Sequence, residues 1–271
     1  METVTLLDTS VGTTNLGDEI IMRCFREEMQ SLLKKYFVMT APTHLRSFSA
    51  MQTIGCLPDS ASEIARSKYK FVCGTNLLSP NLMHRTNQWD LSLLTCKPFQ
   101  DSILVGVGGT TFLNGGLSST YTKAVYQKVL SKEYIHSVRT EQAKESLNEL
   151  GFKALNTGCL TLWKLTPDFC SEIHRKKGDA AVVSLTDYNK DPQRDKQLID
   201  IVRNNYENVF FMPQGIYDRE YLLSIDTGEG ITLLPPIFAA TKSCWILTRS
   251  SIMLALGFME ACLQCATKHG V

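Results

Sequence analysis

Three short polar stretches of this sequence carry residues suited to binding an anion or a polar ligand. In Asn15-Leu16-Gly17-Asp18 a glycine lets the backbone approach a ligand, and the helix expected next presents free N–H groups. In Ser137-Val138-Arg139-Thr140 a guanidinium could grip a carboxylate or phosphate through two parallel hydrogen bonds. Met212-Pro213-Gln214-Gly215 offers an amide side chain. All three follow apolar runs that read as strands.

Each stretch also has a plainer interpretation. Asp18 is a poor neighbour for phosphate, and we expect it either to cap the helix or to bind a hydroxyl group. Arg139 could pair on the surface with Glu141 or Glu145, and Gln214 could simply occupy a turn. The first stretch is neither a Walker loop nor a dinucleotide fingerprint, and no G-x-S-x-G element supports a hydrolase nucleophile.

Two small-residue loops complete the set of candidates. Gly74-Thr75-Asn76 and Gly108-Gly109-Thr110 each follow a further apolar run, although glycines there can also serve only to make tight turns. Because ligands bind beyond the carboxyl ends of parallel strands, these loops are expected to share one site with Arg139. The predicted substrate-binding residues are Asn15, Gly17, Asp18, Gly74, Thr75, Gly108, Gly109, Arg139 and Gln214. No residue is assigned a catalytic role at this stage.

Strand-like and helix-like segments alternate along the chain, which predicts parallel sheets built from βαβ units. The expected strands are 4–7, 71–73, 103–107, 135–138, 180–185 and 209–212, and the expected helices are 18–35, 140–150 and 191–205. Thr140 caps its helix and Gly151 ends it. Between Trp163 and Gly178 the pattern breaks, which predicts a linker and two domains, 1–170 and 171–271.

The composition excludes several classes of protein. The chain has 271 residues, 44% of them hydrophobic, and its net charge of +1 argues against a general nucleic-acid binder. Its first residues, METVTLLDTS, lack the features of a secretion signal, and no apolar stretch reaches the ~18 residues needed to span a bilayer. We therefore expect a cytoplasmic protein with reduced thiols. Cys262 and Cys265 form the only C-x-x-C among the nine cysteines, and without a second pair or a well-spaced histidine no metal is expected. The five histidines have no metal-like spacing, and structural roles are predicted for them.

Two of these stretches carry a family resemblance. Thr14-Asn15-Leu16-Gly17-Asp18-Glu19 before a long helix is similar to the opening N-x-G-D element of the polysaccharide pyruvyl transferase family. Ser137-Val138-Arg139-Thr140-Glu141, followed by a helix that ends at Leu150-Gly151, resembles its central S-x-R-[DT] element. The likeness covers roughly residues 1 to 235. It implies an α/β protein of two Rossmann-like domains with parallel sheets in a GT-B-like arrangement, the second domain being truncated.

The resemblance also implies a reaction in cell-surface or exopolysaccharide synthesis. Pyruvate passes from phosphoenolpyruvate to two hydroxyls of a sugar as a cyclic ketal, and phosphate leaves. By resemblance Arg139 binds the phosphoenolpyruvate anion, and Asn15, Gly17 and Asp18 line the cleft. Phosphoenolpyruvate is a co-substrate, no further cofactor is expected, and the acceptor is a saccharide or lipid-linked glycan. A homo-oligomer is left open. The alternatives are a GT-B-type glycosyltransferase that uses a nucleotide sugar, and a non-catalytic fragment of the family.

The C-terminal end departs from the family. Its late element has the form D-Y-V-G-T-R-[LI]-H-G-G, in which the resemblance assigns the arginine to phosphoenolpyruvate and the histidine to general acid catalysis. This chain has Ser251 to Ala261 at that place, yet those codons read one base out of frame can spell D-Y-V-G-T-R-I-H-G-G. We hypothesise a frameshift between Leu233 and Thr241 that leaves this version inactive. As written, the apolar stretch 246–265 would form a helix, and the incomplete sheet would favour self-association.

Overall fold

The computed structural model describes residues 1–55, 57–83, 88–109, 119–171, 178–237 and 252–255. The chain divides into two compact units. Unit 1 comprises residues 1–13 and 21–160, and unit 2 comprises residues 14–20 and 161–271. Helix α1 (Leu16–Glu28) contributes residues to both.

Unit 1 is built on a parallel sheet whose strand order is β2-β1-β3-β5. Its strands are β1 (Thr3–Asp8), β2 (Phe37–Pro42), β3 (Tyr69–Cys73) and β5 (Ser102–Val105). Two short parallel pairs accompany it: β4 (Asn76–Leu78) with β6 (Gly108–Gly109), and β7 (His136–Val138) with β8 (Ala154–Asn156). The sheet order reverses between β1 and β3, and such a reversal is where open α/β sheets bind ligands.

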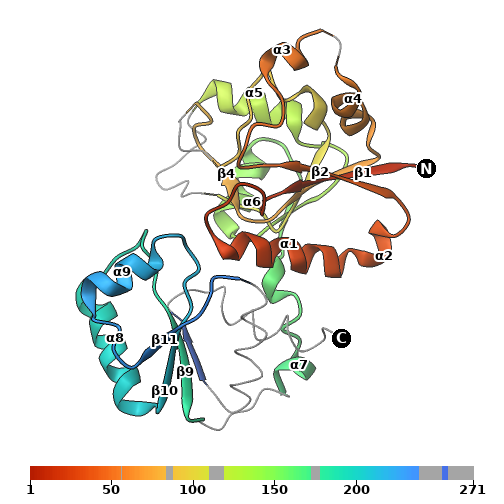
Figure 1. Ribbon diagram of the computed structural model, residues 1–271. Helices are drawn as coiled ribbons and strands as arrows, with labels where there is room; N and C mark the ends of the chain where they lie inside the picture. Colours follow the sequence, from red (N-terminus) through yellow and green to blue (C-terminus); the bar gives the residue numbers. More distant parts are fainter. Residues whose placement is uncertain (56, 84–87, 110–118, 172–177, 238–251, 256–271) are drawn as a thin grey trace. The chain divides into compact units, whose positions relative to one another are not determined.

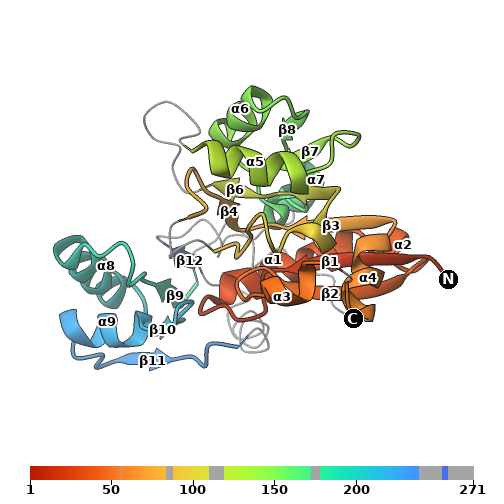
Figure 2. The same ribbon diagram turned by 90° about the horizontal axis from the view of Figure 1, so that it is seen from above.

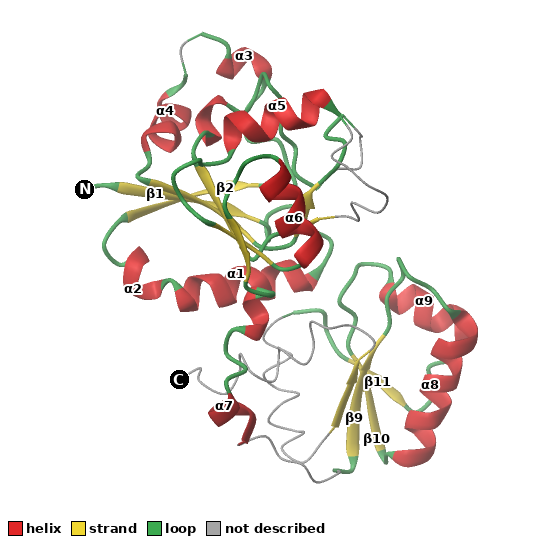
Figure 3. Cartoon of the chain, turned by 180° about the vertical axis from the view of Figure 1, so that it is seen from behind, coloured by secondary structure: helices red, strands yellow, loops and turns green. Residues whose placement is uncertain are grey.

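Helices cover both faces of the unit 1 sheet (Figures 1 and 3). One face carries α1 and α2 (Gln30–Leu33), and the other carries α4 (Asp59–Arg66) and α5 (Thr120–Val129). Helix α6 (Glu141–Glu149) lies beside β7 and β8 (Figure 2). The remaining helical segments are α3 (Ala50–Thr53) and the 3₁₀ turns η1 (Lys97–Phe99) and η2 (Leu160–Leu162).

The strands of unit 1 bury apolar side chains on both faces of the sheet, which explains why helices cover both faces. Leu7 and Val72 belong to the buried cluster that includes residues of α4, α5 and α6. Phe71, the neighbour of Val72 in the strand, instead lies against α1, where its ring centroid is 5.8 Å from that of Phe25. Successive strand residues point to opposite faces, so β1 and β3 are apolar on both. Each fully buried side chain of this size contributes about 1.5–3 kcal/mol of transfer free energy.

Unit 2 contains a second parallel sheet, with strand order β11-β10-β9-β12. The strands are β9 (Ala180–Ser184), β10 (Asn208–Phe211), β11 (Ile231–Leu233) and β12 (Ile252–Ala255). Helices α8 (Pro192–Asn205) and α9 (Asp218–Ile225) cover one face of the β9–β11 strands (Figure 1), and α7 (Pro167–Ser171) precedes the sheet in sequence. Here the strand order reverses between β9 and β12.

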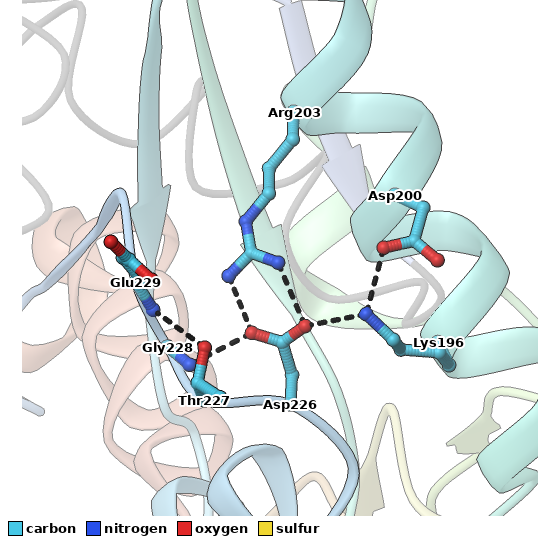
Figure 4. Close-up of polar contacts among 7 residues, drawn as sticks. All are labelled: Lys196, Asp200, Arg203, Asp226, Thr227, Gly228 and Glu229. Atoms are coloured by element: carbon cyan, nitrogen blue, oxygen red, sulfur yellow. Dashed lines mark hydrogen bonds and ion pairs between the residues drawn. The ribbon is translucent and has the colours of Figure 1, made fainter.

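A buried ion cluster joins α8 to the end of α9 (Figure 4). The carboxylate of Asp226, with 2% of its side chain exposed, accepts hydrogen bonds from both terminal nitrogens of Arg203 and from Lys196 at 2.8 Å. The backbone N–H of Gly228 donates a further bond at 2.8 Å. The Arg203 guanidinium is the main reason that the pKa of Asp226 lies well below its usual range. The cluster therefore fixes α8 against α9 through a charge that stays ionised.

Most of the expected elements are present, with three differences. The helix expected at 18–35 is interrupted at Met29, so it forms α1 and α2. The expected linker contains α7. The expected apolar helix at 246–265 is wrong in its described part, because Ile252–Ala255 forms β12, paired in parallel with β9.

Two other expectations are not decided by these elements. The domain boundary at residue 170 and the GT-B-like arrangement stay predictions. The proposed frameshift concerns residues that are largely outside the described part of the chain. Within the described part, no helix is long and apolar enough to cross a membrane.

Candidate functional site

The loop after β3 has an unusual backbone conformation. Gly74 has φ +71°, and Thr75, which carries a side chain, has φ +53°. A Cβ on Gly74 would collide with the Cγ2 atom of Ile21, so this loop requires glycine. A non-glycine residue in this region costs on the order of 1 kcal/mol and is often found at functional sites. The strain is thus located next to the reversal of sheet order in unit 1.

Arg139 lies over the backbone of Gly108. A Cβ on Gly108 would stand 2.5 Å from Nε and 3.2 Å from Cγ of Arg139, and it would collide with Oδ1 of Asn76. The same glycine donates its N–H to the carbonyl of Thr75 at 2.7 Å. The absence of a side chain at position 108 therefore lets a guanidinium and an amide approach the same piece of backbone.

The residues around Arg139 hold its strand end in place. The hydroxyl of Ser137 accepts the N–H of Gly106 at 2.9 Å and lies 2.6 Å from the hydroxyl of Thr157. The N–H of Arg139 donates to the carbonyl of Val107 at 3.1 Å. Thr140 caps α6, as expected, because its hydroxyl accepts the N–H of Ala143. Ser137, Thr140 and the backbone of Arg139 thus make hydrogen bonds within unit 1, and these bonds fix the point from which the Arg139 side chain extends.

The surface ion pairs considered for Arg139 do not form. Glu141 binds Lys144 and the side-chain amide of Asn156 instead, and these hydrogen bonds lower the pKa of the Glu141 carboxyl. Across the described ranges the structure shows no ion pair or side-chain hydrogen bond from Arg139. The guanidinium, half-buried beside Gly108, remains available to an anionic ligand.

Another charged group at the same edge of the sheet is already satisfied. Asp8 ends β1, and its carboxylate accepts the N–H of Ser10 at 2.8 Å, the hydroxyl of Ser10 at 2.5 Å and a guanidinium N–H of Arg26 at 3.1 Å. These three hydrogen bonds fill most of the acceptor sites of the carboxylate. It serves to shape the β1 loop.

The opening Asn-Leu-Gly-Asp stretch belongs to unit 2, where it forms the start of α1 and contacts the Gln214 loop. The side-chain oxygen of Asn15 accepts the N–H of Gly17 at 2.8 Å, so Asn15 caps α1, which begins at Leu16 rather than at Asp18. Asp18 is buried in the first turn. Asn15 also forms an antiparallel bridge with Gly215, and the N–H of Leu16 donates to the carbonyl of Gln214 at 2.8 Å.

The Gln214 loop is held by a buried carboxylate. Asp218, 1% exposed, accepts the N–H groups of Asp187, Gln214 and Gly215 at 3.0, 2.9 and 2.6 Å. The side-chain nitrogen of Gln214 is buried and has no hydrogen-bond partner in the described structure. An orphaned buried amide costs free energy, so a ligand that accepts its hydrogen bond would recover that cost.

The predicted site residues form two groups. Unit 1 brings together Gly74, Thr75, Gly108, Gly109 and Arg139, and unit 2 brings together Asn15, Gly17, Asp18 and Gln214. Sequence reasoning missed Asn76, Asp187 and Asp218 as structural parts of these groups. The sequence could have pointed to them only through their positions, because each lies within four residues of a predicted site residue or of the end of a strand.

The buried histidine of unit 1, His136, has a structural role. His136 is buried, accepts the N–H of Leu104 through Nδ1 at 3.2 Å and donates from Nε2 to the carbonyl of Ser131 at 2.9 Å. Burial lowers its pKa, and its predicted structural role is confirmed. Within the described ranges, no group of three or more His, Cys, Asp or Glu residues could hold a metal ion.

Fold and loops together define an α/β protein with parallel sheets and candidate ligand-binding loops at their carboxyl ends. The model of one family, polysaccharide pyruvyl transferase, matches residues 15–262, which is most of the chain. The chain therefore belongs to the polysaccharide pyruvyl transferase family, as its motifs suggested. The matched range begins at Asn15 and includes Arg139 and Gln214. A comparison with curated proteins found no match.

Proposed function

We propose that this transferase moves pyruvate from phosphoenolpyruvate to a saccharide as a cyclic ketal. Membership of the family supports the general reaction. The observation that carries the proposal for this chain is the Arg139 guanidinium, which lies over Gly108 next to Asn76 without a protein partner in the described ranges. Phosphoenolpyruvate offers a carboxylate and a phosphate, and both fit the planar fork of a guanidinium.

In the proposed reaction, the methylene carbon of phosphoenolpyruvate takes a proton and C2 becomes electron-poor. One acceptor hydroxyl adds to C2 and loses its proton, phosphate leaves with the C–O bonding pair, and the second hydroxyl closes the ketal with loss of its proton. One released proton replaces the one taken by the methylene carbon, and the other ends on the phosphate, which departs as hydrogen phosphate. Arg139 stays charged throughout, holds the substrate and stabilises the negative charge of the departing phosphate. Each hydrogen bond to such a charged group contributes about 1.5–3 kcal/mol.

The proton donor is not assigned to a described residue. The family resemblance places an arginine and a histidine in a late element, and most of the corresponding residues, 251 and 256–261, lie outside the described part of the chain. We propose that the coding frame changes between Leu233 and Thr241 and that this version lacks those two side chains. Sequencing of the coding DNA tests this, because the hypothesis requires an uninterrupted alternative frame that spells the family element.

Further details of the proposal follow from the resemblance. The two units would form a GT-B-like pair working in the cytoplasm, on a saccharide or lipid-linked glycan of cell-surface or exopolysaccharide synthesis. Phosphoenolpyruvate is the donor, and no other cofactor takes part in the proposed reaction. Whether the protein acts as a homo-oligomer is a separate question that its elution volume in gel filtration answers.

Phosphate release tests the proposal. The chain as written and its frame-corrected counterpart are incubated with phosphoenolpyruvate and a panel of glycans, and free phosphate is measured with and without acceptor. The proposal expects acceptor-dependent release from the frame-corrected protein, abolished by Arg139→Ala. Stabilisation of both proteins by UDP or GDP, without any effect of phosphoenolpyruvate, would instead identify a nucleotide-sugar glycosyltransferase.

A further inference from the structure

Two loops of unit 2 leave the carboxyl ends of neighbouring strands and are tied to each other. One follows β9 and the other follows β10, and the two strands pair in parallel. The buried carboxylate of Asp218 accepts the N–H of Asp187 from the first loop and those of Gln214 and Gly215 from the second. β9 also borders β12, where the sheet order reverses, which is the usual place for a ligand in an open α/β sheet.

Two polar groups of these loops have no hydrogen-bond partner among the described residues. The Nε2 atom of Gln214 is buried and unsatisfied. The Oδ1 atom of Asp187 lies 3.4 Å from where a Cβ on Gly215 would stand, and its carboxylate makes no hydrogen bond or ion pair within the described ranges. One group donates hydrogen bonds and the other accepts them. A polyhydroxyl ligand satisfies both at once, whereas an anion would be repelled by Asp187.

The same loops expose aromatic surface. Tyr188, the next residue after Asp187, is 76% exposed, and Tyr217, the residue before Asp218, is 55% exposed. Since Asp218 ties the two loops together, both tyrosines start from backbone near the two polar groups. An aromatic ring with a polar tip suits the apolar C–H face and the hydroxyl edge of a sugar.

We propose that Asp187, Tyr188, Gln214 and Tyr217 form a binding subsite for the acceptor saccharide. This rests on the proposed function, since it assigns the second substrate of that reaction. Gln214 donates to a sugar oxygen, Asp187 accepts from a sugar hydroxyl, and the tyrosines cover the sugar ring. Gly215 keeps the space beside Asp187 open, because a Cβ there would approach the carboxylates of both Asp187 and Asp218.

Saturation-transfer NMR on the full chain tests the subsite without requiring turnover. The probes are methyl glycosides of the common hexoses and N-acetylhexosamines, in the absence of phosphoenolpyruvate. The variants are Tyr217→Ala, Tyr217→Phe and Asp187→Asn, and Tyr134→Ala is the matched control, because Tyr134 is an exposed tyrosine of unit 1. Circular dichroism confirms that each variant is folded.

The subsite predicts binding of at least one glycoside to the unaltered chain. Affinity should fall roughly tenfold in Tyr217→Ala and in Asp187→Asn, since a stacked ring or one hydrogen bond accounts for about that factor. It should persist in Tyr217→Phe and Tyr134→Ala. Absence of any glycoside signal, or equal affinity in all four variants, would overturn the subsite.

Phosphoenolpyruvate binding, measured by calorimetry on the frame-corrected protein, separates this inference from the proposed function. If glycosides bind as predicted but the frame-corrected protein does not bind phosphoenolpyruvate, the proposed donor is wrong and the saccharide subsite stands. If the frame-corrected protein binds phosphoenolpyruvate through Arg139 but no glycoside binds, the subsite is wrong and the donor assignment stands.

Discussion

Replacement of Asp226 by asparagine is expected to loosen the contact between α8 and α9. The carboxylate holds both terminal nitrogens of Arg203, the ammonium of Lys196 and the N–H of Gly228 (Figure 4). An amide keeps the shape and one acceptor oxygen but removes the charge. Breaking a buried ion pair typically costs 3–5 kcal/mol. Because 26% of the Arg203 side chain is exposed, water can solvate the released cation, and we expect about 2–3 kcal/mol.

Hydrogen exchange followed by mass spectrometry measures this change locally, which matters because a chain of two units need not unfold in one step. Peptides from α8 and α9 should exchange about 30- to 150-fold faster in Asp226→Asn, while peptides from unit 1 serve as an internal reference. Asp200→Asn is the matched control. Asp200 binds the same Lys196 at 2.8 Å but is half exposed, so its loss should leave the exchange rates unchanged within error.

The stabilisation that Asp226 provides is expected to depend on pH in one direction only. The pKa of Asp226 is depressed in the folded chain, so its stabilising contribution is fully present above the ordinary carboxyl range near pH 4. As the pH falls below that range, the unfolded chain takes up a proton before the folded one, and the contribution declines. The difference between the unaltered chain and Asp226→Asn should therefore be constant from pH 8 to about 5. Equal exchange in α8 and α9 of both proteins at pH 7 would refute the reasoning.

Three further outcomes are expected from local geometry. In the frame-corrected protein, Gly108→Ala should displace Arg139 and weaken phosphoenolpyruvate binding at least tenfold in calorimetry, with far-UV circular dichroism unchanged. Thr140→Ala removes the α6 cap and should cost about 1 kcal/mol in urea unfolding, and Thr140→Ser should restore it. Tyr126→Phe leaves the backbone N–H and carbonyl of Ser79 without their shared hydroxyl partner, which should cost about 1–3 kcal/mol in the same assay.

Local signals made much of the fold predictable. Thr140 and Gly151 bracket α6 because an N-cap hydroxyl and a left-handed glycine act within a few residues of the helix they bound. The short continuous apolar runs of β1, β3 and β9 likewise predict buried strands directly from the sequence. The start of α1 was misplaced because Asn15 and Asp18 are both good capping residues, and the sequence alone does not say which oxygen reaches the first free N–H.

Non-local packing accounts for what could not be predicted. Asn76 meets Arg139 only because β4 pairs with β6 and thereby brings Gly108 between them. The short apolar run 252–255 fits a helix or a strand equally well, and its pairing with β9 decides the matter. The same holds for Asp187, whose proximity to Gly215 depends on the carboxylate of Asp218. Contacts between residues that are far apart in the sequence cannot be predicted from local sequence patterns.

Calorimetric binding of phosphoenolpyruvate to the frame-corrected chain and to its Arg139→Lys variant tests the central claim most directly. Lysine keeps the charge but loses the planar fork, so the affinity should fall about tenfold or more. Arg46→Lys in the same background, in which an exposed guanidinium that binds Asp90 is changed in the same way, should bind like the frame-corrected chain. An affinity for phosphoenolpyruvate that is the same in all three proteins, or no binding to any of them, would contradict the role assigned to Arg139.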